Sequence, residues 1–124
     1  MRVKFRKKTL NIENQSNKKN EFYAEWNYFI IEIFQNERSI YIDKERWKEH
    51  RYYVCVTNPM GSCIVDGSEC STQSKCLQYA FDNIDADLME MENIVSEKNQ
   101  LIEEGEETKE DIEEIKYWLN SMKY

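Results

Sequence analysis

The sequence has few of the residues that build active sites and cofactor cradles. Among its 124 residues are three glycines, one proline and a single histidine, His50. Three scattered glycines cannot form a phosphate-binding loop, and no P-loop, G-x-G-x-x-G or H-E-x-x-H motif occurs. Serine or cysteine catalysis would have to use His50, which lies in a charged stretch between Glu49 and Arg51. We therefore expect a protein that is not an enzyme and that uses no cofactor.

Long apolar runs are also missing. No run reaches the length of about 18 apolar residues that a membrane-spanning helix needs. The first six residues lead into Lys7 and Lys8 rather than into the apolar segment of a secretory signal. We expect a cytoplasmic protein without a membrane partner.

The four cysteines lack the spacing of a zinc site. Cys55, Cys63, Cys70 and Cys76 include no Cys-x-x-Cys pair, so no tight turn presents two thiolates to one metal ion, with or without His50. We expect small buried hydrophobic residues rather than metal ligands, although zinc binding stays open as an alternative. Cys70 precedes a predicted helix start, where the helix dipole favours thiolate reactivity, so cysteine-based chemistry remains a third reading.

The C-terminal part, residues 72–124, has a strong helical pattern. Apolar residues recur at alternating spacings of four and three, interrupted by one lysine, which predicts a single apolar seam on a helix. The seam consists of Leu77, Phe81, Ile84, Leu88, Met91, Val95, Lys98 and Ile102, and it continues after a break at Gly105-Glu106 with Ile112, Ile115, Leu119 and Met122. Ser71 or Thr72 is expected to cap the first helix and Thr108 the second. The pattern predicts an antiparallel helical hairpin.

The N-terminal part, residues 1–71, has the composition of strands and turns. We expect an edge strand within residues 2–12, a loop over 13–20, and a clear strand over 52–57 that is followed by a turn at 58–61. The chain then returns over 62–65 and turns again at 66–67. Residues 43–51 are expected to form a helical turn or a wide connection.

Residues 21–35 fit two patterns. Phe22, Trp26 and Phe29 fit one face of a helix, whereas the density of aromatic and β-branched residues over 26–34 favours a strand. We favour a hairpin of strand 22–34 with strand 39–42, and the helix stays open. Because strands come first and helices follow, the sequence predicts one α+β domain over residues 1–124, with an antiparallel sheet of about four strands and a C-terminal helical hairpin.

The net charge of −7 is unevenly distributed. Residues 1–20 carry seven Lys or Arg and one Glu, whereas residues 77–124 carry four Lys or Arg and fourteen Asp or Glu. Acidic side chains outside the seam are the candidate partner-binding residues, and Glu90, Glu97 and Glu104 would form one row along the helix. The full set is Asp82, Asp85, Glu90, Glu92, Glu97, Glu103, Glu104, Glu106, Glu107, Glu110, Glu113 and Glu114.

This charge pattern suggests a function by elimination. A rigid acidic rod suits the basic groove of a nucleic-acid-handling enzyme, which it would reach rapidly by electrostatic steering. The composition is typical of small proteins from AT-rich bacterial or phage genomes, so we expect a protein-binding inhibitor of the anti-defence (anti-CRISPR-like) type that does not itself bind nucleic acid. The alternative is an assembly protein that self-associates through the helical hairpin, with Lys98 setting the register. A third possibility is that the acidic residues only solubilise exposed helix faces.

Overall fold

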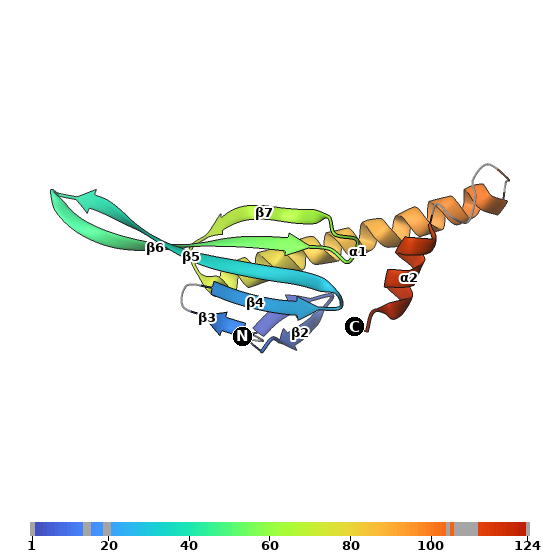
Figure 1. Cartoon of the computed structure of the whole chain (residues 1–124), viewed down its shortest axis with the longest axis horizontal. Coiled ribbons are helices and arrows are strands. Elements are labelled where there is room, and N and C mark those ends of the chain that lie inside the picture. Colours follow the sequence, from blue (N-terminus) through green and yellow to red (C-terminus); the bar gives the residue numbers. More distant parts are fainter. Residues whose placement is uncertain (1, 14–15, 19–20, 104, 106–111, 124) are drawn as a thin grey trace.

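The computed structural model describes residues 2–13, 16–18, 21–103, 105 and 112–123, and its fold is α+β (Figure 1). The described residues form two antiparallel sheets and two helices, which confirms the fold class. The expectation of about four strands is wrong, because one sheet has five strands and a second has two. The elements are β1 (Arg2–Phe5), β2 (Lys8–Asn11), β3 (Ser16–Lys18), β4 (Glu21–Trp26), β5 (Phe29–Ile42), β6 (Glu45–Thr57), β7 (Cys63–Cys70), α1 (Gln73–Glu103) and α2 (Glu113–Ser121).

The five-stranded sheet is a meander in which each strand pairs with the next one along the chain. Its order is β3-β4-β5-β6-β7, and every pairing is antiparallel. β3 lies within residues 13–20, so the interpretation of this stretch as a loop is wrong. The predicted edge strand at 2–12 is also two strands, β1 and β2, which pair with each other.

Three hairpins turn through two-residue loops that contain no glycine. The loops are Arg6-Lys7, Asn27-Tyr28 and Asp43-Lys44, and both residues of each have positive φ, as type I′ turns require. The expected hairpin of strand 22–34 with strand 39–42 is therefore wrong. The chain turns at Asn27-Tyr28, and β5 then runs without a break to Ile42. The helical alternative for residues 21–35 is excluded as well.

β5 and β6 are much longer than their neighbours and project as a two-stranded arm. Residues 29–34 of β5 pair with β4, and 52–57 of β6 pair with β7, whereas 36–42 and 45–51 pair with each other beyond the rest of the sheet. Figure 1 shows this arm extending away from the body of the molecule. Residues 43–51 are thus a tight turn and a strand, and not a helical turn or wide connection.

The segment between β6 and α1 contains one of the two predicted turns. The amide of Gly61 donates to the carbonyl of Asn58 at 3.0 Å, which confirms the turn at 58–61. The prediction of a second turn at Asp66-Gly67 is wrong, because β7 passes through both residues. Cys55 pairs with Asp66 and Val54 pairs with Ser68, so Gly67, with a φ of 70°, is the extra residue of a β-bulge.

α1 covers one side of the sheet and supplies much of the core. Thr72 caps it, because its Oγ1 accepts from the amide of Lys75 at 3.1 Å. The predicted seam is confirmed where it faces the sheet, since its side chains there are at most 2% exposed, namely Leu77, Phe81, Ile84, Leu88 and Met91. Val95 and Lys98 are half-buried, and the side chain of Ile102 lies outside the described residues.

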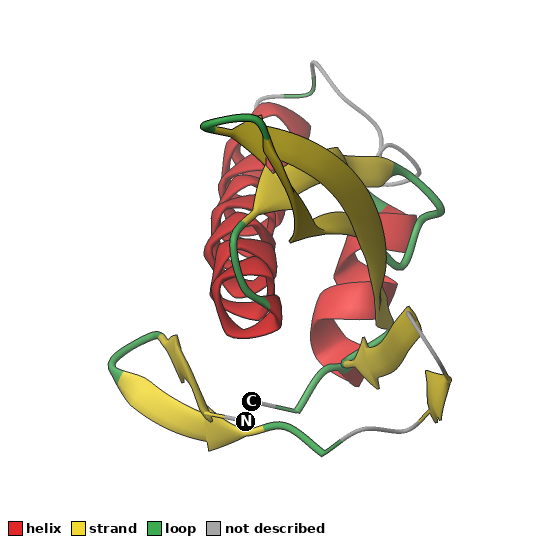
Figure 2. Cartoon of the chain, turned by 90° about the vertical axis from the view of Figure 1, so that its left-hand side faces the viewer, coloured by secondary structure: helices red, strands yellow, loops and turns green. Residues whose placement is uncertain are grey.

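The N-terminal hairpin closes the core beside α1. The ring of Phe5 lies 4.8 Å from the ring of Trp26 and 5.6 Å from the ring of Phe81, and the rings of Trp26 and Phe81 are 5.3 Å apart. Val3 is also buried. These contacts join β1, β4 and α1, which are far apart in sequence, into one aromatic cluster. In Figure 2 the helices and the β1–β2 hairpin lie on the same side of the five-stranded sheet.

α2 returns to the core but is not evident as half of an antiparallel helical hairpin. It contacts α1, yet it has nine residues against the 31 of α1, and Figure 1 shows it descending steeply toward the N-terminal strands. Its predicted apolar residues do face the core, since Ile112 is buried and Ile115, Leu119 and Met122 are partly buried. The predicted cap, Thr108, lies outside the described residues.

Candidate functional site

The acidic residues of α1 do not form a single surface. Arg6, in the turn of the N-terminal hairpin, binds two of them: its Nε lies 2.6 Å from Oδ1 of Asp85, and both terminal nitrogens lie 3.3 Å from Oε1 of Glu92. These ion pairs join residues 79 and 86 positions apart. Asp85 and Glu92 therefore help to hold the hairpin against the helix, and their charge is partly neutralised within the chain.

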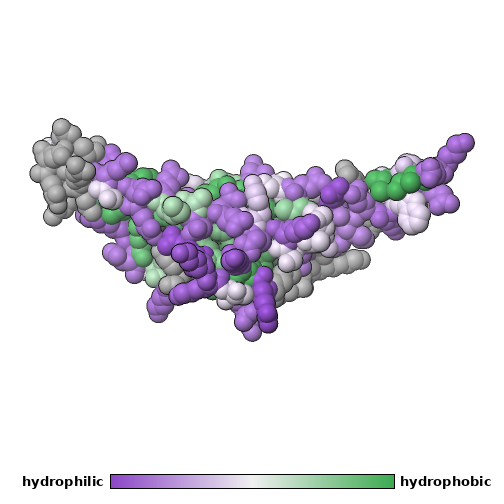
Figure 3. Space-filling view, turned by 180° about the vertical axis from the view of Figure 1, so that it is seen from behind, coloured by the Kyte–Doolittle hydropathy of each residue, from purple (hydrophilic) through white to green (hydrophobic). Residues whose placement is uncertain are grey.

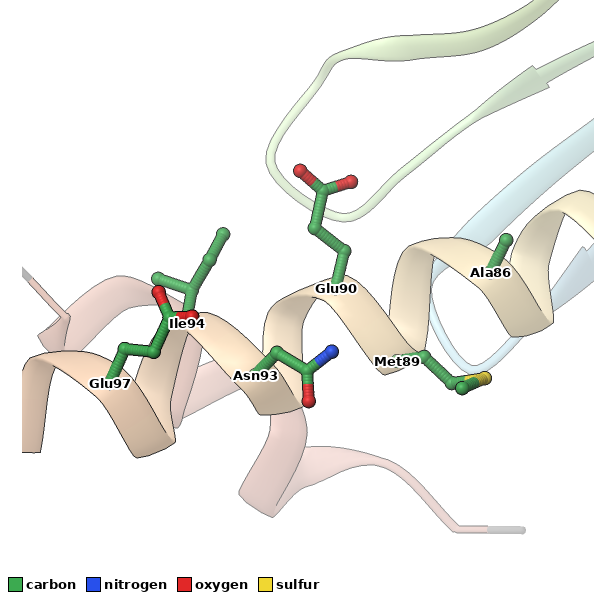
Figure 4. Close-up of a pocket in the computed structure, with 6 residues that line it drawn as sticks. All are labelled: Ala86, Met89, Glu90, Asn93, Ile94 and Glu97. Atoms are coloured by element: carbon green, nitrogen blue, oxygen red, sulfur yellow. The ribbon is translucent and has the colours of Figure 1, made fainter.

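Two other acidic residues face solvent from a different side of α1. Glu90 and Glu97 line a shallow depression of about 460 Å³ together with Ala86, Met89, Asn93 and Ile94 (Figure 4). All six residues come from one helix, so the depression is an open surface and not an enclosed pocket. In Figure 4 Glu90 points toward the turn between β6 and β7, whereas Met89 points away from it. Neither glutamate forms an ion pair with any described residue.

The remaining predicted residues are scattered. Asp82 is exposed and accepts from Nε2 of Gln78 at 3.1 Å, and Glu113 and Glu114 are exposed in the first turn of α2, where the helix dipole favours negative charge. The side chains of five predicted residues lie outside the described part of the chain, namely Glu103, Glu104, Glu106, Glu107 and Glu110. The predicted row of Glu90, Glu97 and Glu104 is therefore described only at Glu90 and Glu97.

Asp87 is an acidic residue whose role the sequence pattern did not indicate. Burial raises the pKa of its carboxyl, and the charge of nearby Glu90 raises it further, while a hydrogen bond from Asn58 lowers it. Nδ2 of Asn58 donates to Oδ2 of Asp87 at 3.4 Å, and Oδ1 of Asn58 accepts from the amides of Met60 and Ser62 at 3.1 and 2.9 Å. Asn58 thus organises its own turn and joins it to α1.

The Asp87→Asn variant is expected to unfold at a higher urea concentration than the wild type near neutral pH. A raised folded-state pKa means that the ionised carboxylate is less favourable in the native state, and the amide removes this charge. The difference should shrink as the pH falls from about 7 through the raised folded-state pKa and should vanish below the ordinary Asp pKa of about 3.9, because Asp87 is then protonated in both states. Urea titrations across this range test the prediction. A difference that grows toward acid would contradict it.

The four cysteines and His50 lie on three consecutive elements, β6, β7 and α1. All four thiols are free; Cys76 is buried, Cys55 and Cys70 are partly buried, and Cys63 is exposed. Nδ1 of His50 lies 2.7 Å from Nε2 of Gln35 at the base of the arm. His50 is two residues along β6 from Tyr52, which pairs with Cys70. Within the described chain, no three His, Cys, Asp or Glu side chains are grouped as metal ligands would be.

The end of the β5–β6 arm exposes large apolar side chains. Tyr41 is 72% exposed, Ile42 is 54% exposed and Trp47 is 53% exposed. Figure 3 shows a hydrophobic region near the end of this arm, bordered by hydrophilic residues. The sequence did not predict this exposed apolar patch, because residues 43–51 were expected to form a helical turn or a wide connection. The alternation of apolar and charged residues on both sides of Asp43-Lys44 is the signal that indicates a hairpin there.

Comparison with known proteins assigns neither a family nor a function to the chain. No protein-family model matches the chain, and no curated protein and no solved structure shows a significant match. Among the described helices, none combines the length and the apolar character that crossing a membrane requires.

Proposed function

We propose that this protein is a non-enzymatic inhibitor that binds a nucleic-acid-handling protein through the acidic outer surface of α1. The observation that supports this proposal is the pair Glu90 and Glu97, whose carboxylates face solvent without an ion pair to any described residue. Unlike Asp85 and Glu92, which Arg6 already binds, these carboxylates are available to a basic partner.

The two glutamates place negative charge at two points along the axis of α1. They are seven residues apart, so at about 1.5 Å per residue they lie about 10 Å apart along the helix axis. The net charge of −10 on residues 77–124 adds long-range attraction to a basic surface, which speeds association at low salt. In this proposal α1 occupies the groove, and nucleic acid is excluded from it.

Reversing the charge of both residues is expected to weaken binding at least about tenfold, the equivalent of about 1.4 kcal/mol. The Glu90→Lys/Glu97→Lys variant places cations where the partner has cations, and the side chains are exposed, so the fold should persist. Affinity capture from a host lysate identifies the partner by mass spectrometry. Titration of that purified partner by surface plasmon resonance then gives the affinity of each variant.

A matched control separates the site from net charge. Glu21 and Asp66 are exposed on the five-stranded sheet, away from α1, so Glu21→Lys/Asp66→Lys makes the same change in total charge. This control should lose much less affinity. Equal losses in the two variants would show that overall charge, and not the surface of α1, determines binding.

Self-association is the second candidate, and the arm is the feature that favours it. The seam of α1 from Leu77 to Met91 is buried inside the chain, so it offers less to a second copy than the sequence suggested. The arm instead has two strands with edges beyond the reach of β4 and β7, and such edges add strands from other chains. Sedimentation velocity at increasing concentration tests this candidate, which a constant monomer would exclude.

A further inference from the structure

The end of the β5–β6 arm carries two exposed cations beside an exposed aromatic ring. Lys44, in the turn, and Arg46, on β6, form no ion pair with any described residue. Nε of Arg46 donates to Oγ of Ser39 at 3.0 Å, which leaves the terminal nitrogens of the guanidinium for another acceptor. Tyr41, which is 72% exposed, pairs with Arg46 across the two strands, so their side chains share one face of the arm.

The depression on α1 has the complementary chemistry. Glu90 and Glu97 supply two carboxylates without an ion pair to any described residue. Met89, which is 54% exposed, and half-buried Ile94 supply apolar surface beside them. Carboxylates pair with cations, and a thioether packs favourably against an aromatic ring. The depression therefore suits a ligand that combines cations with an aromatic ring, as the end of the arm does.

The arm of one chain cannot reach the depression of the same chain. Figure 1 shows the arm at one end of the long axis of the molecule, whereas the second half of α1, coloured orange, extends toward the other end. The two strands of the arm are paired along their whole length, so the arm does not fold back over the sheet. A contact between these two surfaces therefore joins two copies of the chain.

We propose that the end of the arm of one copy docks in the α1 depression of a second copy. Lys44 and Arg46 then lie against Glu90 and Glu97, and Tyr41 covers the apolar lining. The two cations are two residues apart, at most about 7 Å, and the glutamates are about 10 Å apart along the helix. The long side chains of lysine and arginine span the difference. Because the contact joins two different surfaces, each copy uses its arm on one neighbour and its depression on another, and open oligomers form.

This docking regulates the proposed function, because it covers the two glutamates through which the partner is proposed to bind. A copy whose depression is occupied cannot bind the partner, and dilution releases it. This consequence rests on the proposed function, whereas the docking itself does not. The docking also differs from addition of strands along the edges of the arm, which uses backbone groups and does not need Glu90 or Glu97.

Sedimentation velocity of the full chain tests the docking without any partner. The protein concentration is raised from about 10 μM to about 1 mM, which spans the dissociation constants of weak contacts. The series is run at about 0.1 M and about 1 M salt, where the Debye length falls from about 10 Å to about 3 Å. We expect the average mass to rise with concentration beyond that of a dimer, and the apparent dissociation constant to increase at least about tenfold at the higher salt.

Two charge-reversal variants make the test specific. Lys44→Glu/Arg46→Glu changes the arm, and Glu90→Lys/Glu97→Lys changes α1; two reversals change the net charge by four, from −7 to −11 and −3 respectively. Each variant alone should stay monomeric, because like charges meet at the contact. An equimolar mixture should associate, since the unchanged arm of one variant fits the unchanged α1 of the other. Both chains stay negative, so net charge cannot bring them together.

Three results would overturn the docking. They are a wild type that stays monomeric at about 1 mM and low salt, association that neither variant weakens, and a mixture of the two variants that stays monomeric. The arm variant also keeps this proposal separate from the proposed function, because it retains Glu90 and Glu97. Its affinity for the captured partner should match that of the dilute wild type, whichever way the sedimentation result falls.

Discussion

Replacing Phe81 by alanine is expected to lower the free energy of unfolding by about 3–5 kcal/mol. Phe81 is 0% exposed, and its ring packs against Phe5 of the N-terminal hairpin and Trp26 of β4. The substitution leaves a cavity where β1, β4 and α1 meet, so these elements lose contacts together. Urea unfolding followed by circular dichroism measures the change.

Tyr79→Ala is the matched control for this prediction. Tyr79 lies two residues from Phe81 on the same helix but is 41% exposed, so its removal opens no cavity. Its effect should stay below about 1 kcal/mol, as for most surface substitutions. Similar losses in the two variants would mean that the aromatic cluster does not hold the N-terminal hairpin in place.

The second large effect is expected at Asn27, where Asn27→Ala should cost about 2 kcal/mol. Asn27 has a φ of 45° in the turn between β4 and β5, which alanine adopts less readily. Its side chain also donates to the carbonyl of Lys123 at 2.6 Å and accepts from the amide of Lys123 at 2.7 Å. These bonds fasten the end of the chain beyond α2 to the sheet.

The Asn27→Gly variant separates the effect of the positive φ from the effect of the two hydrogen bonds with Lys123. Glycine accepts the positive φ but removes both hydrogen bonds, so it should recover part of the loss and leave the chain after α2 less protected from amide hydrogen exchange. Exchange measured by mass spectrometry reads this protection directly. Full recovery of stability together with unchanged exchange near Lys123 would refute the fastening role.

The first helix, α1, was largely predictable because its signals are local, whereas the packing of α2 against it was not. The seam of α1 follows from a spacing that only a helix brings to one face, and Thr72 supplies the cap. The three two-residue hairpin turns were not predictable in the usual way, because they contain neither glycine nor proline. Asn27 and Asp43 belong to the residue types that tolerate positive φ, but Arg6 and Lys7 do not, and their turn forms because Phe5 and Arg6 are held by α1.

The acidic surface was predictable in composition but not in arrangement. Helical spacing showed that Asp85 and Glu92 lie outside the seam, yet it could not show that Arg6 would bind both of them, because that contact spans the length of the chain. For the same reason Asp87 was missed: its partner Asn58 comes from the turn between β6 and β7. Long-range contacts thus divide the acidic residues into structural ones and solvent-facing ones such as Glu90 and Glu97.

Competition with nucleic acid tests the central claim most directly. The partner captured from lysate is mixed with a fluorescently labelled DNA or RNA duplex, and this protein is added while the anisotropy of the duplex is followed at low and high salt. The proposal predicts that the protein displaces the duplex, that Glu90→Lys/Glu97→Lys displaces it poorly, and that salt weakens displacement steeply. A stable complex in which the partner holds the duplex and this protein together would contradict the proposal that α1 occupies the nucleic-acid groove.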